Sequence, residues 1–164
     1  VLRGLTAAGA SVERVFLPTR AIERCRRCDA NGWGLCRRAG RCAVADDFGT
    51  LVEGIREADV VVFATPVYYS DLSESLRAFT DRLRRTCTHE AGRVSIQGKP
   101  VIGVCVAGGG GGGAPTCCAS LERTLSTCGF DVVDVLPVRR QNLQAKLAAL
   151  EAAGRWLASR PRSV

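Results

Sequence analysis

Continuous apolar runs rich in β-branched residues alternate along this chain with segments of helical periodicity. The runs that we predict to be strands cover residues 12–17, 60–64, 101–106 and 132–138. The run 60–64 does not alternate apolar with polar residues, and a strand lacks such alternation when both of its faces are buried. Helical segments between strands make consecutive strands parallel. The alternation therefore predicts an α/β fold, a doubly wound parallel sheet in a three-layer α/β/α arrangement.

Helix signals fill the gaps between the predicted strands. Asp71 and Glu74 have the spacing of a capping box, Pro115 suits the first turn of a helix, and Gly129 suits the residue after its last turn. We expect Asn142 to cap the last helix. Another helix is expected where two capping aspartates precede apolar residues at helical spacing, namely Asp46, Asp47, Phe48, Leu51, Val52 and Ile55.

The chain has 164 residues, the size of one ordinary globular domain, and no linker or internal repeat divides it. We expect a single domain over 1–164 with a cysteine-rich insertion at 25–42. Residues 1–10 have the pattern of a helix end, and a helix that enters a parallel sheet follows a strand. The chain also contains no Met. We therefore expect a first strand upstream of Val1, which would complete five strands in the order 2-1-3-4-5.

Nine cysteines, an odd number, occur in a chain long enough to fold without cross-links. Disulfide frameworks are typical of short secreted chains that lack a core, so we expect reduced thiols and a cytoplasmic protein. No apolar run approaches the roughly 20 residues of a membrane helix, and no membrane partner is expected. The net charge of +7 is carried almost entirely by arginine, and charge alone does not name a partner.

Two loops follow predicted buried strands, at the edge where open α/β sheets bind ligands. The first combines a turn-forming proline, free backbone amides and two tyrosines that can cover an aromatic face; the alternative is a packed strand-to-helix turn. In the second, glycines let the backbone approach a flat ligand closely; the alternative is a mobile turn. The predicted cofactor-binding residues are Thr65, Pro66, Val67, Tyr68, Tyr69, Ser70, Ala107, Gly108, Gly109, Gly110, Gly111 and Gly112.

Four cysteines within 18 residues form a second candidate site, in the spacing C-x2-C-x7-C-x5-C. Four thiolates suit an iron-sulfur cluster or zinc, and the neighbouring arginines would offset the negative charge of such a centre. A loop of unligated thiols is the alternative. A nucleic-acid patch is disfavoured because the stretch holds one aromatic residue and no recognised motif. The predicted metal ligands are Cys25, Cys28, Cys36 and Cys42.

The remaining reactive side chains show no pairing of a nucleophile with a general base. We therefore predict no catalytic side chain and expect a cofactor to carry any chemistry. Cys117, beside the glycine loop, is a candidate for an accessible thiol, whereas Cys105, Cys118 and Cys128 are expected to pack in the core. His89 follows a helix end, where we expect solvent exposure or a capping role.

Three stretches of the chain together resemble a known family. They are the C-x2-C pair followed by Asp46-Asp47, the segment 58–69 (ADVVVFATPVYY) and the segment 76–82 (LRAFTDR). Their combination resembles the NADPH-dependent FMN reductase-like family, particularly its branch of iron-sulfur flavoproteins, and it spans almost the whole chain. The cysteine spacing departs from that branch, which tends to place the third cysteine two residues after the second, where this chain inserts 29–35.

The resemblance implies a flavodoxin-like fold, with FMN at the carboxyl edge of the sheet and a phosphate-holding loop upstream of Val1. It implies an FMN-dependent oxidoreductase or electron-transfer flavoprotein, such as an NAD(P)H-dependent FMN or quinone reductase, with a 4Fe-4S cluster as a further cofactor. A small molecule or a protein would be the redox partner, and we expect a homo-oligomer. Two alternatives remain, a zinc-stabilised binding or regulatory protein without redox turnover and an FMN reductase whose cysteines are incidental.

Overall fold

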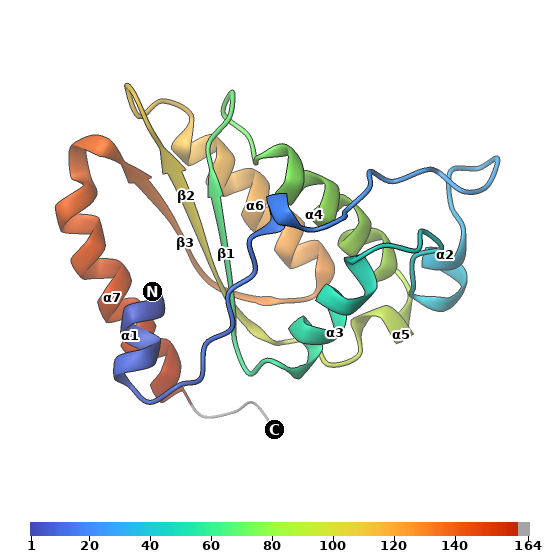
Figure 1. Cartoon of the computed structure of the whole chain (residues 1–164), viewed down its shortest axis with the longest axis horizontal. Coiled ribbons are helices and arrows are strands. Elements are labelled where there is room, and N and C mark those ends of the chain that lie inside the picture. The colour runs from blue at the N-terminus through green and yellow to red at the C-terminus, as the bar shows by residue number, and fades with distance from the viewer. Residues whose placement is uncertain (161–164) are drawn as a thin grey trace.

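The computed structural model describes residues 1–160 and contains one parallel sheet of three strands (Figure 1). The strands are β1 (Val61–Pro66), β2 (Pro100–Ala107) and β3 (Asp131–Arg139), in the spatial order β1-β2-β3. The helices are α1 (Leu2–Ala7), α2 (Leu35–Ala39), α3 (Phe48–Glu57), α4 (Glu74–Thr86), α5 (Glu90–Arg93), α6 (Ala114–Cys128) and α7 (Leu143–Ser159), with short 3-10 turns at Leu17–Thr19 and Arg140–Asn142.

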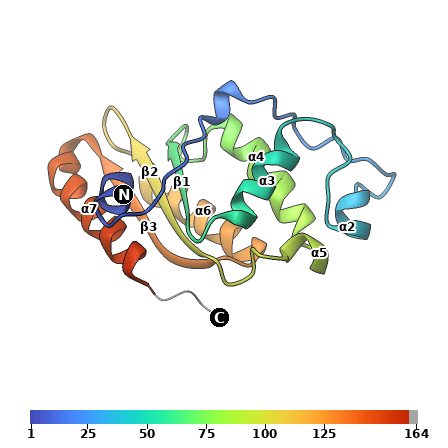
Figure 2. The same cartoon turned by 60° about the horizontal axis from the view of Figure 1, so that its bottom comes forward.

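Helices cover both faces of the sheet, as Figures 1 and 2 show. Alternate residues of β2 point to opposite faces, because successive side chains of a strand do so. On one face, Val101 and Cys105 pack against α3, α4 and α6, and on the other, Ile102 and Val104 pack against α1 and α7. The predicted α/β fold with three layers is therefore confirmed, and its three strands correspond to the last three of the predicted order.

The predicted strand at 12–17 is wrong. Residues 12–16 have no regular structure, and a 3-10 turn begins at Leu17. The segment passes the outer side of β1 (Figure 1), and Val12 packs against the core beneath α1 and α7. No backbone hydrogen bond joins 12–16 to β1 among the described residues. A run of β-branched residues becomes a strand only where a neighbouring strand offers a ladder, so the apolar pattern here reflects packing alone.

Most predicted helix ends are confirmed, but the capping box is not. Gly129 ends α6 in the left-handed conformation, with φ 97°. Helix α4 begins at Glu74 rather than near Asp71, and the Ser73 amide donates to the Thr65 hydroxyl at 3.0 Å. Asp71 therefore lies outside the helix, and its carboxylate accepts hydrogen bonds from Arg77 and Ser120 instead. Asn142 precedes α7 but accepts from the Arg139 amide at 2.8 Å instead of capping the helix.

Candidate functional site

Loops from all three strand ends meet at the carboxyl edge of the sheet. The β1 turn touches the glycine loop at Gly113, where φ is +76° and an added Cβ would lie 2.5 Å from Ser70 Oγ. The glycine loop touches the segment after β3 at Gly111, where an added Cβ would lie 2.9 Å from Gln141 Oε1. Only glycine permits these approaches and these backbone angles. The glycine run therefore joins the three loops into one surface.

The turn after β1 is tight and conformationally unusual. Two backbone hydrogen bonds of 2.9 Å link Tyr68 and Asp71, and the two residues between them, Tyr69 and Ser70, have φ of 48° and 67°. Left-handed backbone is rare for a bulky residue, and such strain collects at ligand sites. The turn holds Tyr69 fully exposed and Tyr68 half exposed above the sheet edge.

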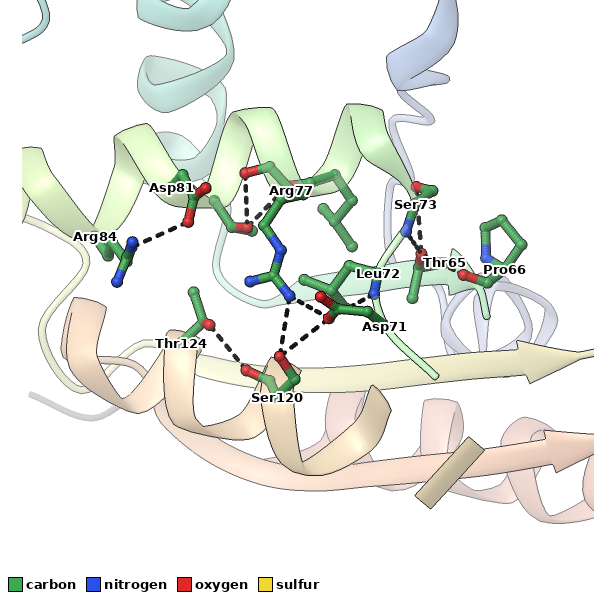
Figure 3. Close-up of polar contacts among 12 residues, drawn as sticks. Thr65, Pro66, Asp71, Leu72, Ser73, Arg77, Asp81, Arg84, Ser120 and Thr124 are labelled. Atoms are coloured by element: carbon green, nitrogen blue, oxygen red, sulfur yellow. Dashed lines mark hydrogen bonds and ion pairs between the residues drawn. The ribbon is translucent and has the colours of Figure 1, made fainter. Parts of the chain in front are cut away.

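Thr65 anchors this turn to α4 through its side chain (Figure 3). Its buried hydroxyl accepts a hydrogen bond from the Ser73 amide at 3.0 Å and donates to the Pro66 carbonyl at 2.8 Å. The hydroxyl of this predicted cofactor-binding residue is thus already engaged within the protein. Thr65 borders the candidate site. Its hydroxyl fixes the position of the turn relative to the start of α4.

A polar network ties the same turn to α4 and α6. Figure 3 shows Arg77 reaching from α4 to Asp71 and Ser120, and Ser120 donates to Asp71 Oδ1 at 3.2 Å. Partial burial raises the pKa of Asp71, but the hydrogen bond from the Leu72 amide and the Arg77 guanidinium outweigh it and hold the pKa below its usual range. These residues support the turn from behind and do not border the ligand groove.

The carboxyl edge holds an open groove of about 820 Å³. Seven of the predicted cofactor-binding residues line it, namely Thr65, Pro66, Val67, Tyr68, Ala107, Gly108 and Gly112. Five do not, namely Tyr69, Ser70, Gly109, Gly110 and Gly111. The groove also has walls that the sequence analysis missed, Val15 and Phe16 together with Ala64 and Val106. Phe16 is two-thirds exposed, and its only sequence signal was the apolar run that we assigned to a strand.

The glycine loop adds free hydrogen-bond donors beside this groove. Within the part of the chain that the structure describes, the amides of Gly109, Gly110 and Gly112 donate to no other group. Among residues 1–160, no carboxylate and no cationic side chain lines the groove. The groove therefore offers apolar walls and backbone donors, which suit a flat, largely apolar ligand with a polar edge.

The four predicted metal ligands border a second, much smaller cavity. It measures about 20 Å³ and is lined by Cys25, Cys28, Cys36 and Cys42 together with Trp33, Arg82 and Arg85. The structure thus brings together cysteines from both ends of the insertion. No three described His, Cys, Asp or Glu side chains converge closely enough to hold a single metal ion. We call this cavity the cysteine pocket.

Arg82 holds the cysteine pocket to the core. Its side chain is 1% exposed and forms two hydrogen bonds with Asp46, of 2.6 and 2.8 Å. It also donates to the Glu23 carbonyl at 3.0 Å, and its guanidinium lies 4.3 Å from the Phe48 ring centroid. Burial lowers the pKa of Arg82, but the Asp46 carboxylate and the Cys42 sulfur beside it raise the pKa above its usual value. An arginine on the apolar stripe of α4, three residues after Phe79, was the sequence signal for this role.

Arg85, one turn after Arg82 on α4, also lines the cysteine pocket. Its guanidinium stacks 4.2 Å from the Trp33 ring centroid and donates to the Gly32 carbonyl. Trp33 and Gly32 belong to the stretch that separates the second and third cysteines. One helix, α4, therefore supplies two of the three arginines that line the pocket, whereas Arg26 and the four thiols come from the insertion.

The remaining thiols and the histidine have structural roles. Cys117 is fully buried, and burial raises the pKa of its thiol, so it is not the accessible thiol that its position suggested. Cys105, Cys118 and Cys128 are buried in the core as expected. His89 caps α5, where its Nδ1 accepts a hydrogen bond from the Ala91 amide at 3.1 Å.

The fold is shared with solved oxidoreductases. An NAD(P)H:quinone oxidoreductase from Methanothermobacter marburgensis superposes with a TM-score of 0.66 at 20% identity, over 99% of this chain and 87% of that chain. An NADH:FMN oxidoreductase superposes with a TM-score of 0.63 at 17% identity, over 99% and 82%. These likenesses show the flavodoxin-like fold. Within residues 1–160, no helix has the length and apolar character needed to cross a membrane.

Sequence comparison gives partial matches to curated proteins. An iron-sulfur flavoprotein of Archaeoglobus fulgidus is 33% identical over 82 residues, which are 50% of this chain and 35% of that protein. The iron-sulfur flavoprotein MJ1083 of Methanocaldococcus jannaschii is 26% identical over 83 residues, 51% of this chain and 40% of that protein. The chain thus spans well under half the length of these relatives. The sequence model of the NADPH-dependent FMN reductase family matches residues 1–138, and the chain therefore belongs to this family.

Proposed function

We propose that this chain binds FMN in the groove at the carboxyl edge of its sheet and acts as part of an NAD(P)H-dependent oxidoreductase. The observation that carries the proposal is the groove itself, which lies at the ends of β1 and β2, where α/β sheets of this kind bind ligands. Its volume of about 820 Å³ falls within the range of small-molecule sites. Family membership supports the same cofactor.

The residues of the groove fit a flavin. Pro66, Val67, Val106 and Ala107 form flat apolar walls, and Tyr68 is half exposed beside them. The unengaged amides of the glycine loop would donate to the polar edge of the ring, as backbone N–H groups do in many cofactor sites. Bound FMN would supply the redox chemistry, exchanging two electrons with a nicotinamide and passing electrons to a small-molecule or protein acceptor. The side chains around it bind, orient and exclude water.

We further propose that the cysteine pocket holds an iron-sulfur cluster. Four thiols without a nitrogen or oxygen ligand are the donor set of such clusters, and all four border one cavity. Arg82 and Arg85 would offset the negative charge of the centre. A tetrahedral zinc ion would need its sulfurs within roughly 3.8 Å of one another, given bonds of about 2.3 Å, whereas a cluster spreads its thiolates over four irons. The cavity of about 20 Å³ has room for about one water molecule, so its lining residues must move apart when a cluster is loaded.

A flavin titration tests the groove. We would follow the quenching of flavin fluorescence with FMN and with riboflavin, which shares the ring but lacks the phosphate. In the Gly108→Leu variant, the added side chain meets no protein atom at its Cβ and projects beside the groove. We expect at least tenfold weaker binding, about 1.4 kcal/mol, with an unchanged unfolding midpoint.

The matched control for this titration is Gly49→Leu. Gly49 lies in α3, away from the groove, and an added Cβ there also meets nothing. This variant should bind both flavins like the wild type. Equal binding by Gly108→Leu and Gly49→Leu, or no flavin binding by the wild-type protein, would reject the groove as the cofactor site.

Metal analysis tests the cysteine pocket. Anaerobic purification followed by iron, sulfide and zinc determination would be applied to the wild type, Cys28→Ser and Cys36→Ser, with Cys118→Ser as the control because Cys118 is buried outside the pocket. Near-stoichiometric iron and sulfide, lost only in the first two variants, are expected. One zinc per chain would instead favour a structural site, and anaerobic material without metal would reject the proposal.

A further inference from the structure

Helix α4 directs two arginines into the cysteine pocket from one side. Arg82 and Arg85 stand three residues apart, on the same face of the helix, and both line the pocket with the four thiols. Neither comes from the insertion that carries the cysteines. Helix α4 therefore contributes two of the three arginines that line the pocket, and Arg26 of the insertion is the third.

Each of these two guanidinium groups carries a buried N–H without a partner. The Nη atoms of Arg82 are engaged by Asp46 and by the Glu23 and Val44 carbonyls, and Arg85 donates to the Gly32 carbonyl. The Nε atoms of both residues are nevertheless buried and make no hydrogen bond with any residue that the structure describes. An unsatisfied buried donor costs about 1–3 kcal/mol, and native proteins keep few of them. Two such donors at one small pocket indicate that an acceptor belongs there.

From this arrangement we propose that Arg82 and Arg85 donate their Nε–H groups to sulfur atoms of the centre bound in the cysteine pocket and thereby raise its reduction potential. The inference rests on the cluster proposed above. Thiolate and sulfide sulfurs accept hydrogen bonds, and donors and positive charge near a cluster favour the form that holds one more electron. Both arginines are positioning residues, which act on the centre without exchanging electrons themselves.

Arg85 is the residue to test, because replacing it leaves no buried carboxylate without a partner. Arg82 pairs with Asp46, whose side chain is 5% exposed, so replacing Arg82 would leave a buried carboxylate unpaired. Arg85 forms no ion pair with any described residue. Arg84 is the matched control: it is half exposed, it faces Asp81 at 3.1 Å (Figure 3), and it does not line the pocket.

The experiment measures the midpoint potential of the cluster in anaerobically purified wild type, Arg85→Gln, Arg85→Lys and Arg84→Gln, together with iron content and unfolding temperature. For Arg85→Gln we expect a shift to more negative potential that changes the ratio of reduced to oxidised cluster at least tenfold, equivalent to 59 mV for one electron. Arg84→Gln should change this ratio less than twofold. Arg85→Lys, which keeps the charge but loses the Nε donor and the stacking on Trp33, should fall between them.

Each outcome decides the matter. A wild-type protein without cluster rejects the proposed function and this inference together. A cluster of equal potential in Arg85→Gln and Arg84→Gln overturns the inference alone. If Arg85→Gln retains no iron, the potential of Arg85→Lys decides, and a wild-type value overturns the inference. If both Arg85 variants lose the cluster, the inference is overturned, because Arg85 then serves to hold the cluster or, where the unfolding temperature also falls, the fold.

Discussion

The groove and the cysteine pocket are each fastened to α4 by a carboxylate–arginine pair, but the two pairs differ in burial. Asp71 and Arg77, behind the groove, are 50% and 31% exposed. Asp46 and Arg82, at the root of the pocket, are 5% and 1% exposed. The loops of the groove are held in place by the strand ends, so their ion pair contributes little to their stability. The pocket is made by an insertion with only one short helix, α2, and depends on its pair for attachment.

This difference follows from which hydrogen bonds hold the backbone of each region in place. The loops of the groove leave adjacent parallel strands, and their spacing is determined by the ladder that pairs Pro66 with Val106 and Val106 with Val138. The insertion has no ladder. Its entry is held where the Glu23 amide donates to Asp46 at 2.8 Å and the Ala21 amide donates to Asp47 at 2.9 Å. We therefore expect the two regions to respond differently to the loss of a single side chain.

The largest effect is expected from Asp46→Ala. The substitution leaves Arg82 buried without its counter-charge, and breaking a buried pair in this way costs about 3–5 kcal/mol. It also releases the Glu23 amide at the entry of the insertion. Urea unfolding monitored by circular dichroism measures the loss, and metal content should fall in the same variant. A loss below about 1 kcal/mol would show that the pocket does not depend on this pair.

A smaller effect is expected from Gly113→Ala, which disrupts the contact between Gly113 of the glycine loop and Ser70 of the β1 turn. A left-handed backbone costs about 1–2 kcal/mol for alanine, and the new Cβ would lie 2.5 Å from Ser70 Oγ. We expect a loss of about 2 kcal/mol and weaker flavin binding without a change in metal content. Gly110→Ala is the control, since its Cβ meets nothing and its φ is not positive. Equal stability of the two variants would contradict the loop contact.

Acid should weaken the ion pair between Asp46 and Arg82. Burial raises the pKa of Asp46, but hydrogen bonds from Arg82 and from the Glu23 and Phe48 amides lower it below its usual value. A carboxyl with a depressed folded-state pKa stabilises the protein fully above its unfolded pKa of about 3.9, and this contribution is lost as the pH falls through the folded pKa. Unfolding free energies between pH 6 and pH 3 should therefore decline more steeply for the wild type than for Asp46→Asn. Parallel declines would refute a role for this carboxylate.

The smallest effect is expected from Asp71→Ala. Its pair with Arg77 is half exposed, and such pairs contribute about 0–1 kcal/mol. The Thr65 hydroxyl and the two backbone hydrogen bonds of the turn remain, so flavin binding should change less than threefold in the fluorescence titration. A loss as large as that in Asp46→Ala would mean that the two regions are anchored alike.

Sequence patterns predicted the three strands of the sheet, the helices of its faces and the two clusters of candidate residues, because these depend on local periodicity and on strand ends. Val61–Pro66 and Pro100–Ala107 are strands close to their predicted positions. Seven of the twelve predicted groove residues line the groove, and all four cysteines border one pocket. In each case the signal lay within a short window of sequence.

The tertiary structure alone decided which residues act together across long distances in the chain. Residues 12–16 have the composition of a strand but no ladder to join, so Val15 and Phe16 became walls of the groove. Arg82 lies 36 residues from Asp46 and binds it in the core. The sequence by itself determined the elements, since apolar spacing selects helix or strand locally. Which charges pair and which loops come into contact depend on how those elements pack. Packing decides this because a charge requires a partner only once it is buried.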